Sequence, residues 1–166
     1  VVMDVETGAI RAMANLKKNS KDELGEYLNM AIGRPGEPGS IFKTATLMTL
    51  LEDGKVTLDT EIPTNHGVLA DFPKVAKDKA LIRYEDESKK KTITVREGFK
   101  RSSNNVFRYL VIKHYGAEDK RKEFTDRLFE YKLHNAYEFD LEEKGYGRSA
   151  LRNSWSIHDL YSTAIG

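Results

Sequence analysis

The sequence predicts an α+β fold in which a β-hairpin comes first and a mainly helical region follows. Residues 1–5 and 9–16 are two apolar, strand-like runs. The Glu6-Thr7-Gly8 segment between them is typical of a tight turn. After the hairpin, apolar residues recur mostly at helical spacing. We therefore expect a hairpin over residues 1–16 and a mostly helical part over residues 17–166.

Composition restricts the classes of protein to consider. With 27 basic and 26 acidic side chains the net charge is +1, which does not favour nucleic-acid binding. The chain has no cysteine, so disulfides, cysteine-ligated zinc and thiol catalysis are excluded. No apolar run approaches the roughly 20 residues of a membrane span. The length of 166 residues suits one domain.

The hairpin raises the question of whether the domain is complete. A lone hairpin is marginally stable and needs further strands or a covering helix. Later in the chain only 68–69, 80–83 and 91–95 resemble short strands. We therefore expect residues 1–166 to be part of a larger domain whose other strands lie outside them. The alternative is a small α+β domain with clipped ends. An unpaired sheet edge would favour self-association.

The elements after the hairpin follow from local signals. Residues 17–23 are polar and predict a loop, and 33–39 contain two prolines and three glycines, which exclude a regular element. From Ser40 onward apolar residues cover several helical faces. This pattern predicts a buried helix over 40–53, with Ser40 as its N-cap and Gly54 after its end.

The second half of the chain is predicted to be helical around exposed loops. The charged run 85–91 predicts a loop, and Thr94 with Glu97 fits a capping box that opens a short helix. Further helices are expected over 105–115 and 118–133, and a last one capped near Ser156.

Ser40 and Lys43 form the first candidate site. Residues i and i+3 share a helix face, so the serine hydroxyl can lie beside the lysine amine. A serine needs a neighbouring base to become a nucleophile, and a lysine whose pKa is lowered by burial can be that base. The alternative is a capping serine and a solvated lysine. The same spacing recurs at Ser88 and Lys91, but within a charged run where the lysine stays protonated.

Uncharged polar residues gather between two predicted helices, and they form the second candidate site. Ser102 and Ser103 can relay protons, and Asn104 offers both a donor and an acceptor to an amide. The alternative is that Ser103 or Asn104 only caps a helix. The four histidines show no metal-ligand spacing with a carboxylate, so no metal is expected.

Together these segments resemble the transpeptidase domain of penicillin-binding proteins. Ser-x-x-Lys with a second serine motif is typical of that family and of serine β-lactamases. Residues 2–15 resemble the family's opening hairpin, 37–43 its nucleophile segment, and 102–104 its second motif in the Ser-Ser-Asn form. Ser102 follows Ser40 by 62 residues, which suits the family, and 162–166 also resemble a family segment.

The resemblance implies a role for each motif residue. Ser40 would be the acyl-enzyme nucleophile and Lys43 the base for acylation. Ser102 would relay a proton toward the leaving amine. Asn104 would bind the substrate amide and help to hold Lys43. Ser103, the residue between Ser102 and Asn104, would belong to the substrate-binding motif. A shifted register, Ser103-Asn104-Asn105, is the less favoured alternative.

The resemblance also implies a function and a setting. The parent protein would be a serine D,D-transpeptidase that cross-links peptidoglycan stem peptides ending in D-Ala-D-Ala and is acylated by β-lactams. It would use no cofactor, bind no nucleic acid, and work at the periplasmic face of a bacterial inner membrane through an anchor outside this chain. The hairpin fits class B enzymes of high molecular mass better than class A.

One departure from the family pattern keeps other functions open. The sequence contains no Lys-Thr-Gly, Lys-Ser-Gly or His-Thr-Gly. In the family this element lies on a later strand, which agrees with the expected missing strands. The enzymatic alternative is a serine β-lactamase or a β-lactam sensor domain, although no additional deacylating base is evident. The other alternative is a helical interaction module without catalysis.

Overall fold

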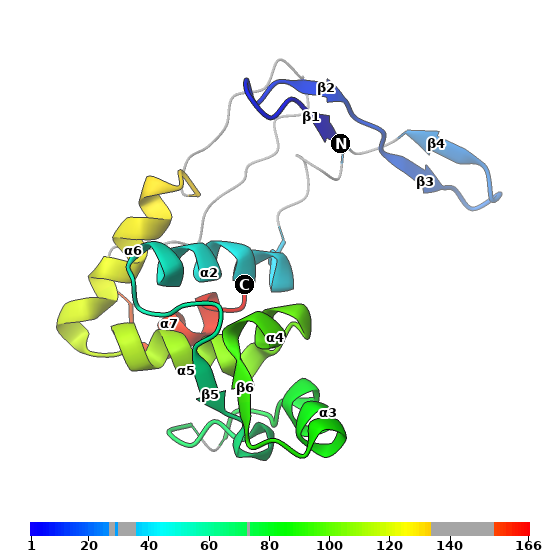
Figure 1. The fold of residues 1–166 in the computed structure, drawn as a ribbon. Coiled ribbons are helices and arrows are strands. Elements are labelled where there is room, and N and C mark those ends of the chain that lie inside the picture. Colours follow the sequence, from blue (N-terminus) through cyan, green and yellow to red (C-terminus); the bar gives the residue numbers. More distant parts are fainter. Residues whose placement is uncertain (27–28, 30–35, 73, 134–154) are drawn as a thin grey trace. The chain divides into compact units, whose positions relative to one another are not determined.

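The fold is α+β, as the sequence predicts. The computed structural model describes residues 1–26, 29, 36–72, 74–133 and 155–166. They belong to two compact units, which are described separately here (Figure 1). The first unit contains residues 1–26, 29 and 36, and the second contains 37–72, 74–133 and 155–166.

The predicted N-terminal hairpin is present in the first unit. Strand β1 (Val2–Met3) pairs antiparallel with β2 (Ile10–Ala12). The turn is closed by Asp4, whose Oδ1 accepts hydrogen bonds from the backbone N–H of Thr7 at 2.9 Å and from its hydroxyl at 2.8 Å. Gly8 supplies the positive φ of +71° that the turn requires.

A second hairpin follows where the sequence predicts a loop over 17–23. Strand β3 (Leu16–Lys18) pairs with β4 (Leu24–Glu26), so strand structure extends to Glu26 instead of ending at residue 16. The turn is built on Asn19, whose Oδ1 accepts from the backbone N–H groups of Lys21 at 2.8 Å and Glu23 at 3.1 Å. Nearly all of its strand residues are exposed, so the apolar–polar alternation that marks a half-buried strand is missing.

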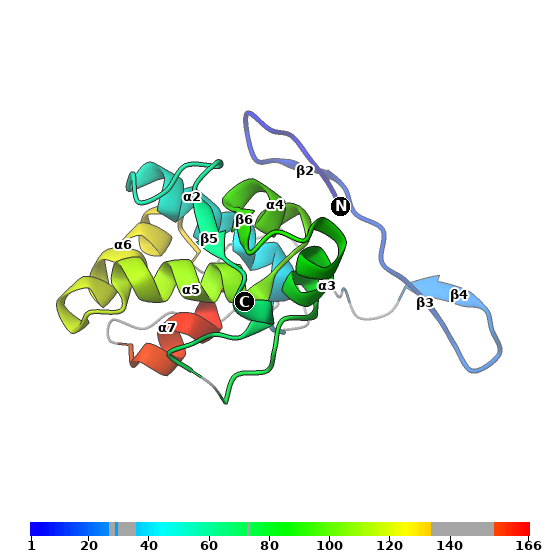
Figure 2. The same ribbon diagram turned by 60° about the horizontal axis from the view of Figure 1, so that its bottom comes forward.

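Helix α5 is the centre of the second unit. It contacts α2, α4, α6 and α7, and Figures 1 and 2 both show α7 running beside it. The helices of this unit are α2 (Lys43–Glu52), α3 (Lys79–Ser88), α4 (Val95–Lys100), α5 (Asn104–Tyr115), α6 (Arg121–Glu130) and α7 (Ile157–Thr163).

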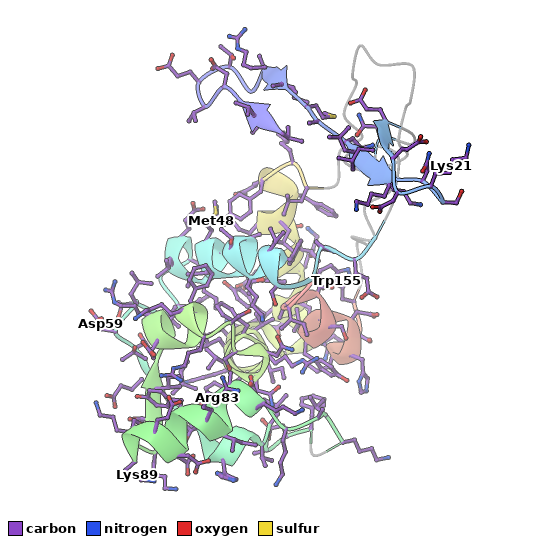
Figure 3. All side chains as sticks on the ribbon, turned by 90° about the vertical axis from the view of Figure 1, so that its right-hand side faces the viewer. Lys21, Met48, Asp59, Arg83, Lys89 and Trp155 are labelled. Atoms are coloured by element: carbon purple, nitrogen blue, oxygen red, sulfur yellow. The ribbon has the colours of Figure 1, made fainter. Side chains whose placement is uncertain are left out.

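The apolar core of the second unit lies between these helices. Fully burying one such side chain contributes about 1.5–3 kcal/mol. Trp155, labelled in Figure 3, is 8% exposed and meets the ring of Phe124 edge-on at 6.0 Å between centroids. Completely buried members from α2, α5, α6 and α7 are Leu50, Val106, Phe107, Val111, Tyr115, Phe124, Leu128 and Leu160.

The region between α2 and α4 differs from the prediction. Residues 80–83, expected as a possible ribbon, and much of the charged run 85–91 belong to α3. The helix buries Leu81 and Glu85 and exposes its other charged residues, so the charge run covers a helix face and not a loop. The only ribbon described here pairs β5 (Glu61–Pro63) with β6 (Thr92–Thr94), and 68–69 is not a strand.

Several predicted helix ends are confirmed. The Thr94 hydroxyl accepts from the Glu97 backbone N–H at 3.2 Å and caps α4. Ser156 and Asp159 form a reciprocal capping box at the start of α7. Gly54 adopts a φ of +61° after the end of α2, a conformation that glycine adopts without steric cost.

Candidate active site

Ser40 lies in a short helical turn that leads into α2. This turn, η1 (Gly39–Phe42), begins at Gly39, whose φ of +59° bends the chain into it. The predicted N-cap role of Ser40 is wrong, because α2 begins at Lys43 and η1 has no side-chain cap. Since the hydroxyl of Ser40 is not used to cap the helix, it can bond elsewhere, and the residue is exposed.

The backbone of this turn packs against residues 164–166. Gly166 has a φ of +90°, and a Cβ on it would overlap the carbonyl group of Gly39. The Thr46 hydroxyl, on α2, donates to the carbonyl oxygen of Ala164 at 3.0 Å. Glycine at position 166 therefore lets the residues that follow α7 pack directly against the segment that carries Ser40.

Lys43 joins the two candidate motifs. Its side chain is only 1% exposed, and its Nζ lies 3.0 Å from the Ser40 Oγ. The same nitrogen lies 3.0 Å from the Ser102 Oγ and 2.7 Å from the Ser102 carbonyl oxygen. The hydroxyls of Ser40 and Ser102, which lie 62 positions apart in the sequence, therefore share one amine.

The surroundings of Lys43 shift its protonation equilibrium toward the neutral form. Burial lowers the pKa of the Lys43 amine below the ordinary lysine value of 10.5. The negative charge of Asp78 opposes this effect and raises the pKa, whereas the positive charge of Arg108 lowers it. Burial is the largest of the three influences, so the net direction is downward, as a lysine acting as a base requires.

Ser102 occupies a strained backbone position between α4 and α5. Its φ is +52°, in the left-handed region that side chains other than glycine rarely adopt. Two backbone hydrogen bonds close the turn, from the Ser102 N–H to the Phe99 carbonyl and from the Ser103 N–H to the Gly98 carbonyl, both 2.9 Å. This conformation places both the carbonyl and the hydroxyl of Ser102 within hydrogen-bond distance of Lys43.

The neighbours of Ser102 differ in what they offer to a ligand. Ser103 does not fit the expected substrate-binding role, because it is fully buried and caps α5 by accepting from the Val106 N–H at 3.2 Å. Asn104 is exposed at the start of α5, and within the described residues its side chain makes no hydrogen bond. The expected contact between Asn104 and Lys43 is therefore absent from this structure.

The alternative register is disfavoured by Asn105. This side chain is 3% exposed and donates to the carbonyl oxygens of Gly67 at 2.8 Å and Ala76 at 3.4 Å. Its Oδ1 accepts a hydrogen bond from Arg108 at 3.2 Å. Asn105 therefore connects α5 to the segment before α3 by hydrogen bonds, and it is not available to a substrate.

Asp78 is the residue beside the site that the motif analysis missed. Its carboxylate is 9% exposed and accepts from the Ser103 hydroxyl at 2.7 Å and from the Asn105 N–H at 2.8 Å. An aspartate just before a helix is a common N-cap signal, and it could have placed the start of α3. No local pattern predicts that it also reaches residues 25 and 27 positions later.

The second Ser-x-x-Lys match is not a comparable site. Lys91 is largely exposed and forms an ion pair with Glu85. The Ser88 hydroxyl accepts a hydrogen bond from the backbone N–H of Lys90 at 3.1 Å. Over the described ranges, no hydrogen bond connects Ser88 to Lys91, and no group of three or more potential metal ligands is found.

Comparison with known families assigns the chain to one of them. A serine becomes a nucleophile when a neighbouring base can take its proton, and Lys43 lies within hydrogen-bond distance of Ser40. The chain matches the penicillin-binding protein transpeptidase domain over residues 1–166 and therefore belongs to that family. Its members are penicillin-binding transpeptidases that act on peptidoglycan. A search of curated proteins gave no match.

Proposed function

We propose that this chain carries the nucleophile and the base of a serine D,D-transpeptidase. The observation that supports this most strongly is the position of the buried Lys43 amine, 3.0 Å from the hydroxyls of both Ser40 and Ser102. In this proposal Ser40 attacks the carbonyl carbon of the D-Ala-D-Ala bond in one stem peptide. The acyl group then passes from Ser40 to an amine of another stem peptide, which cross-links the two.

The hydrogen-bond pattern around Lys43 is compatible with a neutral amine that removes the proton of Ser40. A neutral amine has two N–H donors and one lone pair. A carbonyl oxygen only accepts, so one N–H points to Ser102 O at 2.7 Å. The second N–H can point to Ser102 Oγ, which leaves the lone pair for the Ser40 hydroxyl at 3.0 Å.

The same three contacts remain usable after the proton transfer. When Ser40 Oγ bonds to the substrate carbonyl carbon, its proton moves to Lys43, which becomes an ammonium with three donors. The Ser102 hydroxyl, 3.0 Å from that nitrogen, can pass a proton to the amine of the departing D-Ala. The exposed Asn104 at the start of α5 is proposed to hydrogen-bond the substrate amide.

β-Lactams would acylate the same serine because they present a strained amide to it. The purified protein is incubated with benzylpenicillin and its intact mass is measured. The wild type should gain the mass of one penicilloyl group, and Ser40→Ala should gain none. Ser88→Ala, which changes the serine of the other Ser-x-x-Lys match, should react like the wild type. Loss of the adduct in Ser88→Ala but not in Ser40→Ala would overturn the assignment.

The lifetime of the adduct separates this proposal from its alternatives. A transpeptidase keeps the penicilloyl group, whereas a serine β-lactamase hydrolyses it and turns over a chromogenic β-lactam. A sensor domain forms a stable adduct too but does not release D-Ala from a donor stem peptide. A helical interaction module would form no adduct, and binding to its partner would survive Ser40→Ala.

The setting of the protein is part of the same proposal. Domains of this family are typically extracytoplasmic parts of anchored proteins. Over the residues that the structure describes, no helix is both long and apolar enough to cross a membrane. We place the domain at the periplasmic face of the inner membrane, in a class B parent that supplies an anchor and a strand with the Lys-Thr-Gly element. Fractionation of cells that express the tagged parent tests this placement.

Self-association is proposed for the chain on its own. In each described hairpin two short strands pair only with each other, and large apolar residues such as Val2 (61% exposed) and Leu24 (64%) face solvent. Open strand edges with exposed apolar side chains favour pairing with another chain. Sedimentation of residues 1–166 at high concentration should show oligomers, and a single monomeric species would contradict this.

A further inference from the structure

One buried carboxylate caps two helices beside the proposed site. Asp78 Oδ1 accepts from the Ala80 N–H at 2.8 Å and so caps α3. Its Oδ2 accepts from the Ser103 hydroxyl at 2.7 Å and from the Asn105 N–H at 2.8 Å at the start of α5. Unpaired N–H groups and the helix dipole both favour a negative charge at a helix N-terminus, and Asp78 lies at two of them.

The loop that carries Asp78 is tied to α5 by further contacts. The carbonyl oxygen of Gly67 accepts from the Asp78 N–H at 2.9 Å and from Asn105 Nδ2 at 2.8 Å. Gly67 has a φ of +74°, and a Cβ there would lie 2.6 Å from the Asp78 carbonyl oxygen. The close approach therefore depends on glycine, and it fixes the position of Asp78 relative to Asn105.

Ser102 is held in its strained conformation from both sides. Before it, the turn is closed by backbone hydrogen bonds to Phe99 and Gly98. After it, Ser103 and Asn105 are bound to the Asp78 carboxylate. A left-handed conformation is strained for any residue other than glycine, and it persists only where its surroundings fix it. Asp78 supplies the part of this constraint that lies outside the turn itself.

We propose that Asp78 is a positioning residue for acylation, which sets the Ser102 carbonyl and hydroxyl relative to the Lys43 amine. The inference rests on the proposed function, because it assumes that Lys43 and Ser102 act on Ser40. Asp78 itself has no hydrogen bond to Lys43 among the described residues. It acts through the Ser103–Asn105 segment and through its charge.

The charge of Asp78 gives the role a signature that a purely structural cap lacks. The charged groups that act on Lys43 are Asp78, which precedes α3, and Arg108 on α5, and its hydrogen-bond partners are Ser40 and Ser102. Asp78 raises the pKa of Lys43 and Arg108 lowers it. Neutralising Asp78 therefore shifts the rise of acylation rate with pH toward lower pH.

The test uses the full-length protein. The rate constant of acylation by benzylpenicillin is measured against pH for Asp78→Asn and is normalised to the concentration of folded protein. An asparagine keeps the shape but replaces one accepting oxygen with a donor. This donor then faces either the Ala80 N–H or the Ser103 hydroxyl and the Asn105 N–H. We expect the plateau rate to fall by at least about tenfold, as expected for a displaced catalytic group, and the rising limb to move to lower pH.

Asp53→Asn is the matched control. Asp53 is also a partly buried carboxylate with several donors, Tyr115 Oη at 2.7 Å and Arg127 Nη2 at 2.6 Å among them, but it lies at the far end of α2. This variant should lose thermal stability and keep the wild-type rate and pH profile. If Asp78→Asn behaves in the same way as Asp53→Asn, Asp78 is only a structural cap and the inference is overturned.

A milder variant covers the case in which Asp78→Asn does not fold. Ser103→Ala removes one donor to Asp78 and leaves the charge in place, so the rate should fall while the pH profile keeps its position. An unchanged rate in Ser103→Ala would overturn the positioning role. The wild type and Ser40→Ala are measured alongside. Absence of an adduct on the wild type would overturn the proposed function itself, whereas normal wild-type acylation with an unaffected Ser103→Ala would overturn only this inference.

Discussion

The Lys43 amine lies 2.7 Å from the carbonyl oxygen of Ser102, a residue whose φ is +52°. The contact connects a strained turn with a buried base, two features that a chain usually avoids. Burial costs the lysine its hydration, and the left-handed conformation costs steric energy. Both costs are incurred at one place, where the proposed chemistry needs a fixed amine next to two hydroxyls.

The strain at Ser102 predicts that activity and stability separate on substitution. Ser102→Ala and Ser102→Gly both remove the hydroxyl, so both should slow acylation strongly. Only glycine adopts this φ without a steric cost, so Ser102→Gly should be more stable than Ser102→Ala by about 1 kcal/mol. Urea denaturation followed by circular dichroism measures the difference. An alanine variant at least as stable as the glycine variant would show that the turn is not strained.

The lowered pKa of Lys43 predicts the pH dependence of acylation. Only the neutral amine can accept the Ser40 proton, so the rate rises with pH through the pKa of Lys43. Because burial holds that pKa below 10.5, the rate should approach its plateau at a pH lower than an ordinary lysine would allow. Stopped-flow acylation with a chromogenic β-lactam measures the profile. A rate that keeps rising up to about pH 10.5, as an ordinary lysine would give, would contradict a base with a lowered pKa.

Glu85 predicts a specific acid sensitivity. Hydrogen bonds from Lys91 and Thr64 lower the pKa of Glu85 to about 2. A carboxylate with a lowered pKa stabilises the fold above its unfolded-state pKa, and this contribution is lost as the pH falls through the folded-state value. The loss should therefore occur between about pH 5 and pH 2. Urea denaturation across this range should show a weaker pH dependence for Glu85→Gln than for the wild type.

Thr64→Val is a variant with an intermediate expected acid sensitivity. The Thr64 hydroxyl donates to Glu85 Oε2, and valine has nearly the same shape without this donor. Its pH dependence should lie between those of the wild type and Glu85→Gln. A Glu85→Gln variant with the full wild-type acid sensitivity would show that other carboxylates are responsible.

The contact between α4 and α5 depends on Gly98. A Cβ on this residue would lie 2.9 Å from Val106 Cγ1 in the fully buried core. Overpacking of this kind costs about 1–3 kcal/mol, so Gly98→Ala should lower the free energy of unfolding by that amount. Gly36→Ala, where a Cβ would have no neighbour within 4 Å, is the control. Adding Val106→Ala to Gly98→Ala removes the clash, so the double variant should lose less stability than the sum of the two single variants. A loss of unfolding free energy equal to that sum would contradict the clash.

Sequence reasoning worked best where one short pattern is sufficient. The Ser40 and Lys43 pair, the caps at Thr94 and Ser156, and the first hairpin each follow from residues a few positions apart. The family resemblance added Ser102 to the pair, and the structure brings it to the same amine.

Two of the errors have a common physical origin, because they depend on contacts between distant segments. The charged run in α3 resembles a loop until the burial of Glu85 is known. Ser103 resembles an exposed motif residue until Asp78 is found against it. The second hairpin is exposed on both faces, so no apolar period identifies it. Burial and long-range contacts decide the first two cases, and a single sequence does not show either.

Trp155 is an intrinsic fluorescent probe of the second unit. It is the only tryptophan in the chain, it is 8% exposed, and it packs against Phe124 of α6. The Arg121 side chain also donates to its carbonyl oxygen at 3.3 Å, so α6 holds both its ring and its backbone. Separation of α6 from this residue should therefore shift the indole emission to longer wavelength. Unfolding of the hairpins, which carry no tryptophan, should leave the emission unchanged.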